Sequence, residues 1–171
     1  YAGYLNVDEV EDVEKEWDRI AKILNVSKSE LKENILPLQA LYSIAEHSRA
    51  LLVALNDGAL PSNVGGEYNL RILARRTFGF IQKYNWNISL IDVCKWHAEY
   101  LKPLYPELSE NLDSVSKILK VEEQKYLQAQ EKSRQVLNKI LTTEITPQKL
   151  IELYDSQGIS PELVKEAAAK I

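Results

Sequence analysis

Three arginines that follow a glycine-rich loop are the residues of this chain whose type and spacing best suit a defined chemistry. Arg71, Arg75 and Arg76 come soon after Gly65 and Gly66, where the loop passes into a predicted helix. The first turn of a helix presents unpaired N–H groups and a partial positive charge, both of which attract anions. Because the N–H donors of a planar guanidinium match the geometry of phosphate oxygens, the segment predicts a binding site for a nucleic-acid backbone.

The spacing of these arginines fits a second interpretation equally well. Arg71 and Arg75 are four residues apart and share a helix face, whereas Arg76 lies about 100° further round. A solvated helix face with ordinary ion pairs would have the same pattern. The residues alone therefore leave open both a phosphate-binding surface and a plain polar surface.

Other side chains offer weaker signals of chemistry. Cys94 and His97 have the C-x-x-H spacing that places both on one helix face, but two ligands do not make a zinc site. A buried cysteine beside an ordinary histidine is the preferred interpretation. Glu122 and Glu123 are expected on a solvated helix face rather than as an acid–base pair. The sequence has no Walker-type phosphate loop, and no serine–histidine–acid or Cys–His arrangement can be assigned. It therefore assigns neither a catalytic residue nor a metal ligand.

Charge is spread unevenly along the 171 residues. The net charge is −4, and residues 1–36 account for it with nine acids against five bases, whereas the rest of the chain holds sixteen of each. The local arginine cluster is thus a better guide to partners than the net charge. With one cysteine and no apolar run of the roughly 20 residues that a membrane span needs, we expect a cytoplasmic protein. The chain begins with Tyr1 and has no methionine, which indicates a fragment or a processed form.

A helical scaffold must position these side chains, and the sequence predicts an all-α fold. Apolar residues recur at spacings of three and four, and glycine and proline fall where helices start and stop. The predicted helices span residues 7–24, 27–35, 37–56, 67–84, 89–102 and 109–141, and two more begin at Thr146-Pro147 and Ser160-Pro161. We expect a multi-helix bundle with one long spine helix and a small C-terminal helical subdomain.

Capping residues set several of these boundaries. Ser27 with Glu30 is typical of a capping box, and Pro37 suits the first turn of a new helix. Ser89 and Ser109 are the expected N-caps of the two helices that follow the loop and the arginine helix. Each of these residues therefore predicts a helix start.

The longest predicted helix has a loose heptad repeat that Glu122 and Ser133 interrupt. That pattern favours the spine of a bundle over a free coiled coil. The helix breaks divide the chain into an acidic helical segment (1–36), a larger helical subdomain (37–142) and a small helical subdomain (143–171).

Three ordered motifs in the middle of the chain resemble a known family. AEHSRA at 45–50, DGALPSN at 57–63 and EYNLRILARR at 67–76 are similar to the ADHxRA helix, the DGxxPSN loop and the GYxLRRIxRR helix of the alanyl-tRNA synthetases. The chain departs from that pattern at Glu46, Glu67 and Ala74. Residues 118–141 and 150–168 resemble the long helix and the LYDTYGFP segment of the same family, whereas residues 1–36 match poorly.

The resemblance implies that the chain is the tRNA-recognition region of a longer enzyme, an ATP-dependent alanine–tRNA ligase. In that family a class II catalytic core that uses ATP and magnesium precedes this region, and an editing domain with zinc ligands follows it. The chain by itself is thus expected to hold no cofactor and to be inactive in alanylation. The implied partners are the acceptor stem of alanine tRNA and the rest of the synthetase chain, with neither DNA nor a membrane.

The resemblance also implies which residues contact the RNA. The family identifies its tRNA by a G·U wobble pair in the acceptor stem, and Asn63 and Asp155 stand at the positions associated with that recognition. The wobble leaves the guanine 2-amino group unpaired in the wide minor groove, where a carboxylate or amide oxygen can accept from it and an amide N–H can donate to the uracil side. Contacts to the tRNA backbone are expected from Arg49, Gly65, Gly66, Tyr68, Arg71, Arg75 and Arg76.

Simpler roles and other functions stay open at this point. Asn63 also suits a turn or a helix-entry cap, and Asp155 also suits a solvated position near a helix end. A helical protein–protein interaction module would use the acidic face of the first helix or the long helix. A non-catalytic synthetase paralogue would bind RNA without charging it.

Overall fold

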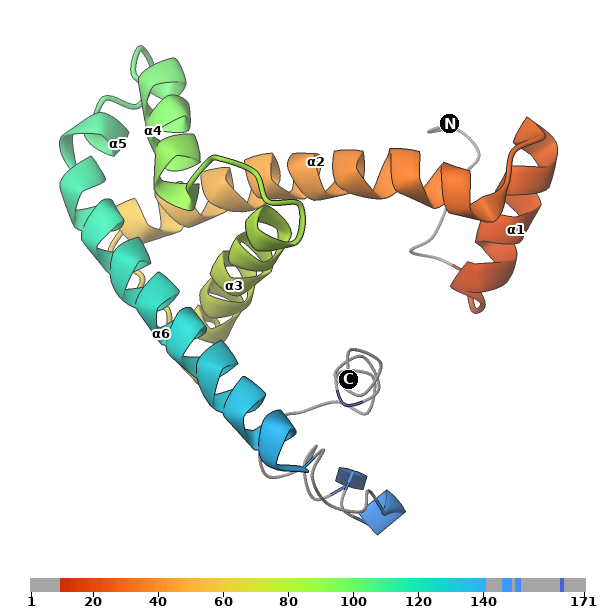
Figure 1. The fold of residues 1–171 in the computed structure, drawn as a ribbon. Coiled ribbons are helices and arrows are strands. Elements are labelled where there is room, and N and C mark those ends of the chain that lie inside the picture. The colour runs from red at the N-terminus through yellow and green to blue at the C-terminus, as the bar shows by residue number, and fades with distance from the viewer. Residues whose placement is uncertain (1–9, 141–145, 149, 152–163, 165–171) are drawn as a thin grey trace. The chain divides into compact units, whose positions relative to one another are not determined.

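The computed structural model describes residues 10–140, 146–148, 150, 151 and 164, and within this part it contains helices and no strand. The all-α prediction is confirmed. The helices are α1 (Val13–Leu24), α2 (Lys28–Asn56), α3 (Glu67–Lys83), α4 (Leu90–Leu101), α5 (Glu107–Glu110) and α6 (Leu112–Ile140), as Figure 1 shows. Among the residues that the structure describes, none of the helices combines the length and the apolar character of a membrane span.

The chain divides into two compact units, Tyr1–Leu119 and Lys120–Ile171. The boundary that the sequence suggested after residue 36 falls inside the unbroken helix α2. The boundary suggested after residue 142, and most of the C-terminal subdomain, fall outside the described residues. Helical structure does begin at Pro147, where the Leu150 N–H donates to the Thr146 carbonyl at 3.2 Å.

Helix α1 begins later than the sequence suggested. Residues 10–12 are not helical, and the Asp12 carboxylate accepts from the Lys15 N–H at 3.1 Å, so Asp12 is the N-cap. The helix ends at Asn25, which has a left-handed φ of 54°. The N–H groups of Asn25 and Val26 donate to the carbonyls of Lys22 and Ala21, at 3.2 and 3.1 Å, so carbonyls that a further turn would have bonded are satisfied and the helix stops there.

Helix α1 packs against the start of α2 through its predicted apolar stripe. The buried residues of this cluster are Trp17, Ile20 and Ala21 of α1 and Leu31 and Ile35 of α2. Partly buried Leu24, Val26 and Leu36 surround them. The stripe prediction is confirmed for these residues, and the cluster gives α1 a core of its own at one end of α2.

The predicted helix break before Pro37 is wrong, because α2 is one helix of 29 residues with Pro37 inside it. Ser27 does cap it, since its hydroxyl accepts from the Glu30 N–H at 3.1 Å. A proline inside a helix removes one backbone hydrogen bond and costs about 3 kcal/mol. Ile35 and Ala40, both buried, lie on either side of Pro37, so packing on both sides offsets that cost.

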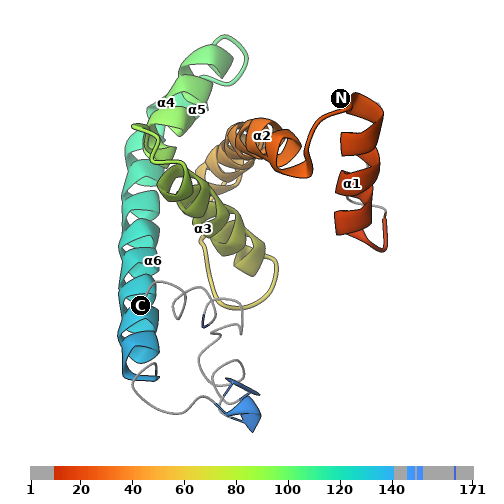
Figure 2. The ribbon, with the colours of Figure 1, turned by 45° about the vertical axis from the view of Figure 1, so that its right-hand side comes forward.

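Helix α2 is the element that the rest of the first unit packs against. Its C-terminal half contacts α3, α4 and α5, while α1 lies at its other end (Figure 1 and, turned by 45°, Figure 2). The core of this half consists of Ile44, Ser48, Leu51, Leu52 and Leu55 of α2, Ala74, Thr77 and Phe78 of α3, and Leu90, Val93, Cys94 and Ala98 of α4. The arginine helix is thereby fixed against α2.

Two expectations about the last third of the chain are wrong. Ser109 does not open the long helix: it lies inside the short α5, where its hydroxyl donates to the Ala98 carbonyl at 3.1 Å, and α6 starts at Leu112. Glu122 does not lie on a solvated face, because its side chain is only 2% exposed. Its position in the heptad, in line with buried Leu119, predicted this better than its charge did. Ser89 does cap α4, with a full capping box that includes Asp92.

Candidate nucleic-acid interface

The loop between α2 and α3 has a defined shape that its own residues maintain. Gly58 and Gly65 have φ values of 94° and 66°, in the left-handed region that residues with a side chain rarely adopt. The Ser62 hydroxyl donates to the Val64 carbonyl at 2.8 Å and accepts from the Val64 N–H at 3.2 Å. The Ser62 N–H donates to the Glu67 carbonyl of α3 at 3.3 Å. The loop is therefore tied to the start of α3 rather than free.

Arg71 holds the tip of this loop from the first turns of α3. Its side chain is buried, with 8% exposure, and it donates through Nη1 to the Asn63 side-chain carbonyl and through Nη2 to the Pro61 carbonyl at 3.2 Å. A guanidinium has donors only, so the Asn63 atom that faces it must be Oδ1. The Asn63 Nδ2, with its two donors, is then the part of the amide left for an external acceptor.

This geometry favours a role for Arg71 within the loop. The sequence suggested a phosphate contact, but the guanidinium is directed into the loop. A buried charge that donates to two oxygens of one loop acts on the conformation of that loop. The sequence offered only one sign of this role: an arginine in the second turn of a helix that follows an asparagine-containing glycine loop.

Three predicted backbone contacts lie with Asn63 on the surface at the start of α3. Gly65, Gly66 and Tyr68 are exposed, and no side chain caps the helix at Gly66. The N–H groups of Tyr68 and Asn69 already donate to the carbonyls of Gly65 and Gly66, at 3.2 and 3.1 Å. The helix N-terminus thus offers a phosphate fewer unpaired N–H groups than the sequence suggested.

Further along α3, Arg75 is half-buried and Arg76 is exposed. The Arg76 guanidinium carbon lies 6.0 Å from the ring centroid of Phe80. On α2, burial and then the nearby charge of Arg76 lower the pKa of His47. The His47 Nε2 is buried without a hydrogen-bond partner in the described part of the chain. Arg76 therefore carries an outward positive charge at the α2–α3 junction.

Arg49 is not part of this group. Its guanidinium pairs with Glu46 of the same helix at 2.7 Å. It lines one cavity with Trp96, Tyr100 and other α4 residues, and another with Tyr105 and Leu108 near α5. Arg49 thus lies on the side of α2 that faces α4 and α5. The other site residue, Asp155, lies outside the described residues, and its role in RNA recognition stays a prediction.

Cys94 and His97 pack α4 against α2. The His97 Nε2 lies 3.0 Å from the Ala45 carbonyl and 3.1 Å from the Ser48 hydroxyl, and the Cys94 thiol donates to the Ser48 carbonyl at 3.5 Å. Burial raises the pKa of Cys94 to about 12. A thiol with such a pKa is a poor nucleophile at neutral pH. In the described parts of the chain, no three His, Cys, Asp or Glu side chains are grouped to hold a metal ion.

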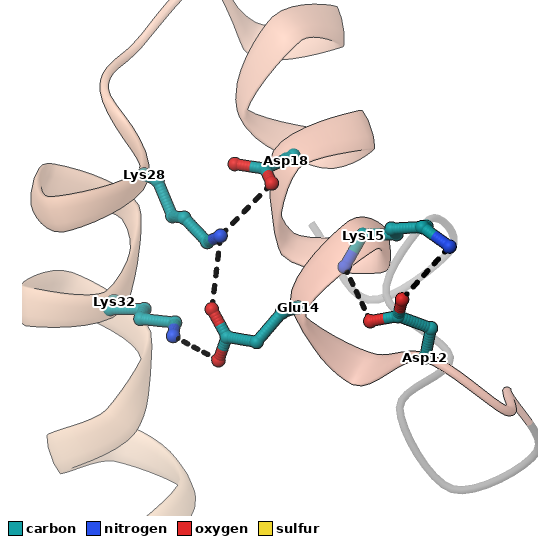
Figure 3. A network of polar contacts seen from close by, with 6 residues as sticks. All are labelled: Asp12, Glu14, Lys15, Asp18, Lys28 and Lys32. Atoms are coloured by element: carbon teal, nitrogen blue, oxygen red, sulfur yellow. Dashed lines mark hydrogen bonds and ion pairs between the residues drawn. The ribbon is translucent and has the colours of Figure 1, made fainter.

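The acidic face of α1, the alternative interaction surface, is partly neutralised by lysines of α2 (Figure 3). Lys28 pairs with Glu14 and with Asp18, both at 2.9 Å, and Lys32 pairs with Glu14 at 2.6 Å. These lysines lower the pKa of Glu14. The network reduces the negative charge that this face can offer to a basic partner.

Comparisons with known proteins place the loop and α3 in a wider context. The family described as "tRNA synthetases class II (A)" matches residues 7–171, which includes the N-terminal segment that the motifs did not reach. The chain is 46% identical over 169 residues, or 98% of its length, to the alanine–tRNA ligase of Methanocella arvoryzae. It is 38% identical over 164 residues (95% of the chain) to that of Nitrosopumilus maritimus, and 36% identical over 172 residues (99% of the chain) to that of Methanococcus aeolicus. The chain spans only 18–19% of the length of these relatives.

Proposed function

The chain belongs to the class II (A) tRNA synthetase family, and from this premise we propose that it is the acceptor-stem recognition region of an alanine–tRNA ligase. The single observation that carries the proposal is the pair of hydrogen bonds by which buried Arg71 holds Pro61 and Asn63. They keep an exposed amide in one orientation beside a basic helix. The relatives are named alanine–tRNA ligases, which supports alanine tRNA as the proposed partner.

In the proposed mechanism Asn63 and Asp155 divide the recognition of a G·U pair. The Asn63 Nδ2 donates to an acceptor on the uracil side of the minor groove, since its Oδ1 is held by Arg71. The guanine 2-amino group needs an acceptor, and Asp155 is the residue proposed for it. The minor groove of A-form RNA is wide and shallow enough for both side chains to reach the base edges.

Contacts to the RNA backbone position the stem but carry no sequence information. We assign them to Arg75 and Arg76, with close approach of the strand at Gly65, Gly66 and Tyr68. Arg71 is instead a positioning residue that acts through Asn63. Arg49 faces α4 and α5, on a different side of α2, and is not assigned to this group of contacts.

The ligase activity belongs, in this proposal, to the longer parent protein. ATP and magnesium would bind its catalytic core and zinc its editing domain, and no residue of the present chain is assigned to them. The chain alone is expected not to activate alanine. Its proposed partners are tRNA and the rest of the synthetase, in the cytoplasm.

Titration of an acceptor-stem minihelix into the chain at low and high salt tests the proposal. Binding that weakens steeply with salt is expected, because phosphate contacts release counterions. Absence of binding at low salt would favour the interaction-module alternative. Assay of alanine activation by the parent protein separates a true ligase from a paralogue that only binds RNA.

A further inference from the structure

A groove between α2 and the C-terminal half of α3 extends beyond the site described above and shares only Arg76 with it. It encloses about 510 Å³, and its lining is Leu36, Gln39, Ala40, Tyr42 and Ser43 of α2 with Arg76, Phe80, Lys83 and Tyr84 at α3. No carboxylate is among these residues. The chain as a whole has a net charge of −4, whereas the lining of this groove contains two cations and no acid. The local charge of the groove is therefore positive.

The two cations of the groove are available to an external anion. Arg76 and Lys83 are both exposed, and neither forms an ion pair with any residue that the structure describes. Each lies near an aromatic ring instead, with the Lys83 Nζ 5.4 Å from the centroid of Tyr84. A cation placed over a ring keeps its charge and remains able to bind an anion.

The same groove carries aromatic rings in two different settings. Tyr84 is fixed, because its ring stacks on Trp86 with centroids 4.9 Å apart and an interplanar angle of 23°. Tyr42 is 73% exposed, so its ring can accept a planar partner. Gln39 and Ser43 lie within one turn of Tyr42 on the same helix and supply polar groups beside it. The groove thus combines an exposed aromatic ring, hydrogen-bonding groups and two positively charged side chains.

We propose that this groove binds an unpaired nucleotide of single-stranded RNA, with the base stacked on Tyr42 and the flanking phosphates held by Arg76 and Lys83. Bases stack on exposed aromatic rings whatever their sequence, and cations beside the ring follow the backbone. The choice of RNA as the polymer rests on the proposed function. Lys83 lies twelve residues beyond Arg71, about 18 Å along the axis of α3, so one nucleotide cannot occupy both the groove and the Asn63 loop.

Binding of a short single-stranded oligoadenylate to the 171-residue chain tests this assignment. Tyr42→Ala is expected to weaken binding about tenfold, the loss typical of one base–aromatic stack. Tyr42→Phe keeps the ring and should bind as the wild type does. Tyr100→Ala is the matched control, because Tyr100 is an 83% exposed tyrosine on α4 that does not line this groove. Lys83→Gln should lower the salt slope by about 0.7, whereas Lys95→Gln on α4 should leave it unchanged.

Two results would overturn the assignment. One is equal loss of oligoadenylate binding in Tyr42→Ala and Tyr100→Ala. The other is competition by inorganic polyphosphate without any effect of Tyr42→Ala, which would reduce the groove to a patch for anions. A duplex minihelix measured in parallel separates the two proposals: a chain that binds the minihelix but not the oligoadenylate refutes only the groove, and the reverse refutes only acceptor-stem recognition.

Discussion

The guanidinium of Arg71 donates a hydrogen bond to the side-chain carbonyl of Asn63, eight residues earlier in the chain. The second nitrogen of the same group holds the Pro61 carbonyl at 3.2 Å. A buried cation therefore sets the direction of an exposed amide. The relationship separates Arg71, which shapes the loop, from Arg75 and Arg76, which are proposed to contact RNA.

Arg71→Ala is expected to lower the free energy of unfolding by about 1–3 kcal/mol, because it leaves the Asn63 and Pro61 oxygens without their donor. It should also abolish preference for a wobble pair, since the Asn63 amide would lose its orientation. Urea denaturation and minihelix binding measure the two effects. An Arg71→Ala variant with unchanged stability, and with a salt slope of binding reduced by the value of one phosphate contact, would show that Arg71 binds RNA directly.

Arg75→Ala and Arg76→Ala should weaken wobble and Watson–Crick minihelices alike. Each is expected to reduce the salt slope of binding by about 0.9, the value for one lost phosphate contact on a duplex. Arg134→Ala is the control, because that exposed arginine pairs with Glu131 on α6 and has no proposed contact. An unchanged slope in Arg75→Ala removes that residue from the proposed interface.

Cys94 should resist alkylation in the folded chain. Its side chain is fully buried, and burial raises its pKa from 9.0 to about 12, so the reactive thiolate is scarce. The folded state thus holds the proton more tightly, and the contribution of Cys94 to stability falls as pH rises above 9. Iodoacetamide labelling followed by mass spectrometry should detect modification only in urea, and rapid labelling of the native chain would contradict the packing of α4 on α2.

The lowered pKa of His47 predicts a pH dependence of stability. Because burial and the charge of Arg76 disfavour the protonated imidazole, the unfolded chain binds the proton more tightly than the folded chain does. Stability should therefore fall as pH drops below the ordinary value of 6.5. His47→Gln should have a flatter profile than the wild type in that window. Identical profiles would mean that His47 titrates as it does in water.

The docking of α1 should depend on apolar packing more than on its ion pairs. Trp17→Ala is expected to cost about 3–5 kcal/mol, since the ring is 4% exposed within the α1–α2 cluster. Glu14→Gln should have a small effect that disappears at high salt, because its contacts with Lys28 and Lys32 are solvent-exposed. Limited proteolysis at α1 and urea denaturation compare the two. A larger loss in Glu14→Gln than in Trp17→Ala would reverse this order.

Local signals in the sequence predicted the elements that depend on neighbouring residues. Ser27 and Ser89 cap helices where they were expected, and the glycine loop lies between α2 and α3. Pro37 was misjudged because tertiary packing on both sides of it outweighs its local preference. Asp12 shows the opposite case, in which a local signal outweighs the apolar pattern. The pattern predicted a helix start at residue 7, but the Asp12 cap starts the helix at Val13.

The candidate site was predictable in outline but not in the roles of its residues. The motifs identified Asn63 and the arginines, and the glycine spacing indicated a turn. Sequence position cannot tell an inward arginine from an outward one when both follow the same loop. Arg71 is buried and Arg76 is exposed, because helix phase places the first beneath the loop and the second at the α2–α3 groove. The groove itself needs two helices, and no single motif contains it.

The most direct test of acceptor-stem recognition is the ratio of dissociation constants for minihelices that differ only in a G·U or a G·C pair. We expect the wild-type chain to prefer the wobble. Asn63→Asp keeps an acceptor for Arg71 and removes both Nδ2 donors, so it should lose about 1–3 kcal/mol of that preference while its stability is retained. Asp155→Ala should have a loss of similar size. A wild-type chain with no preference, or an Asn63→Asp variant that keeps the wild-type ratio, would contradict the central claim.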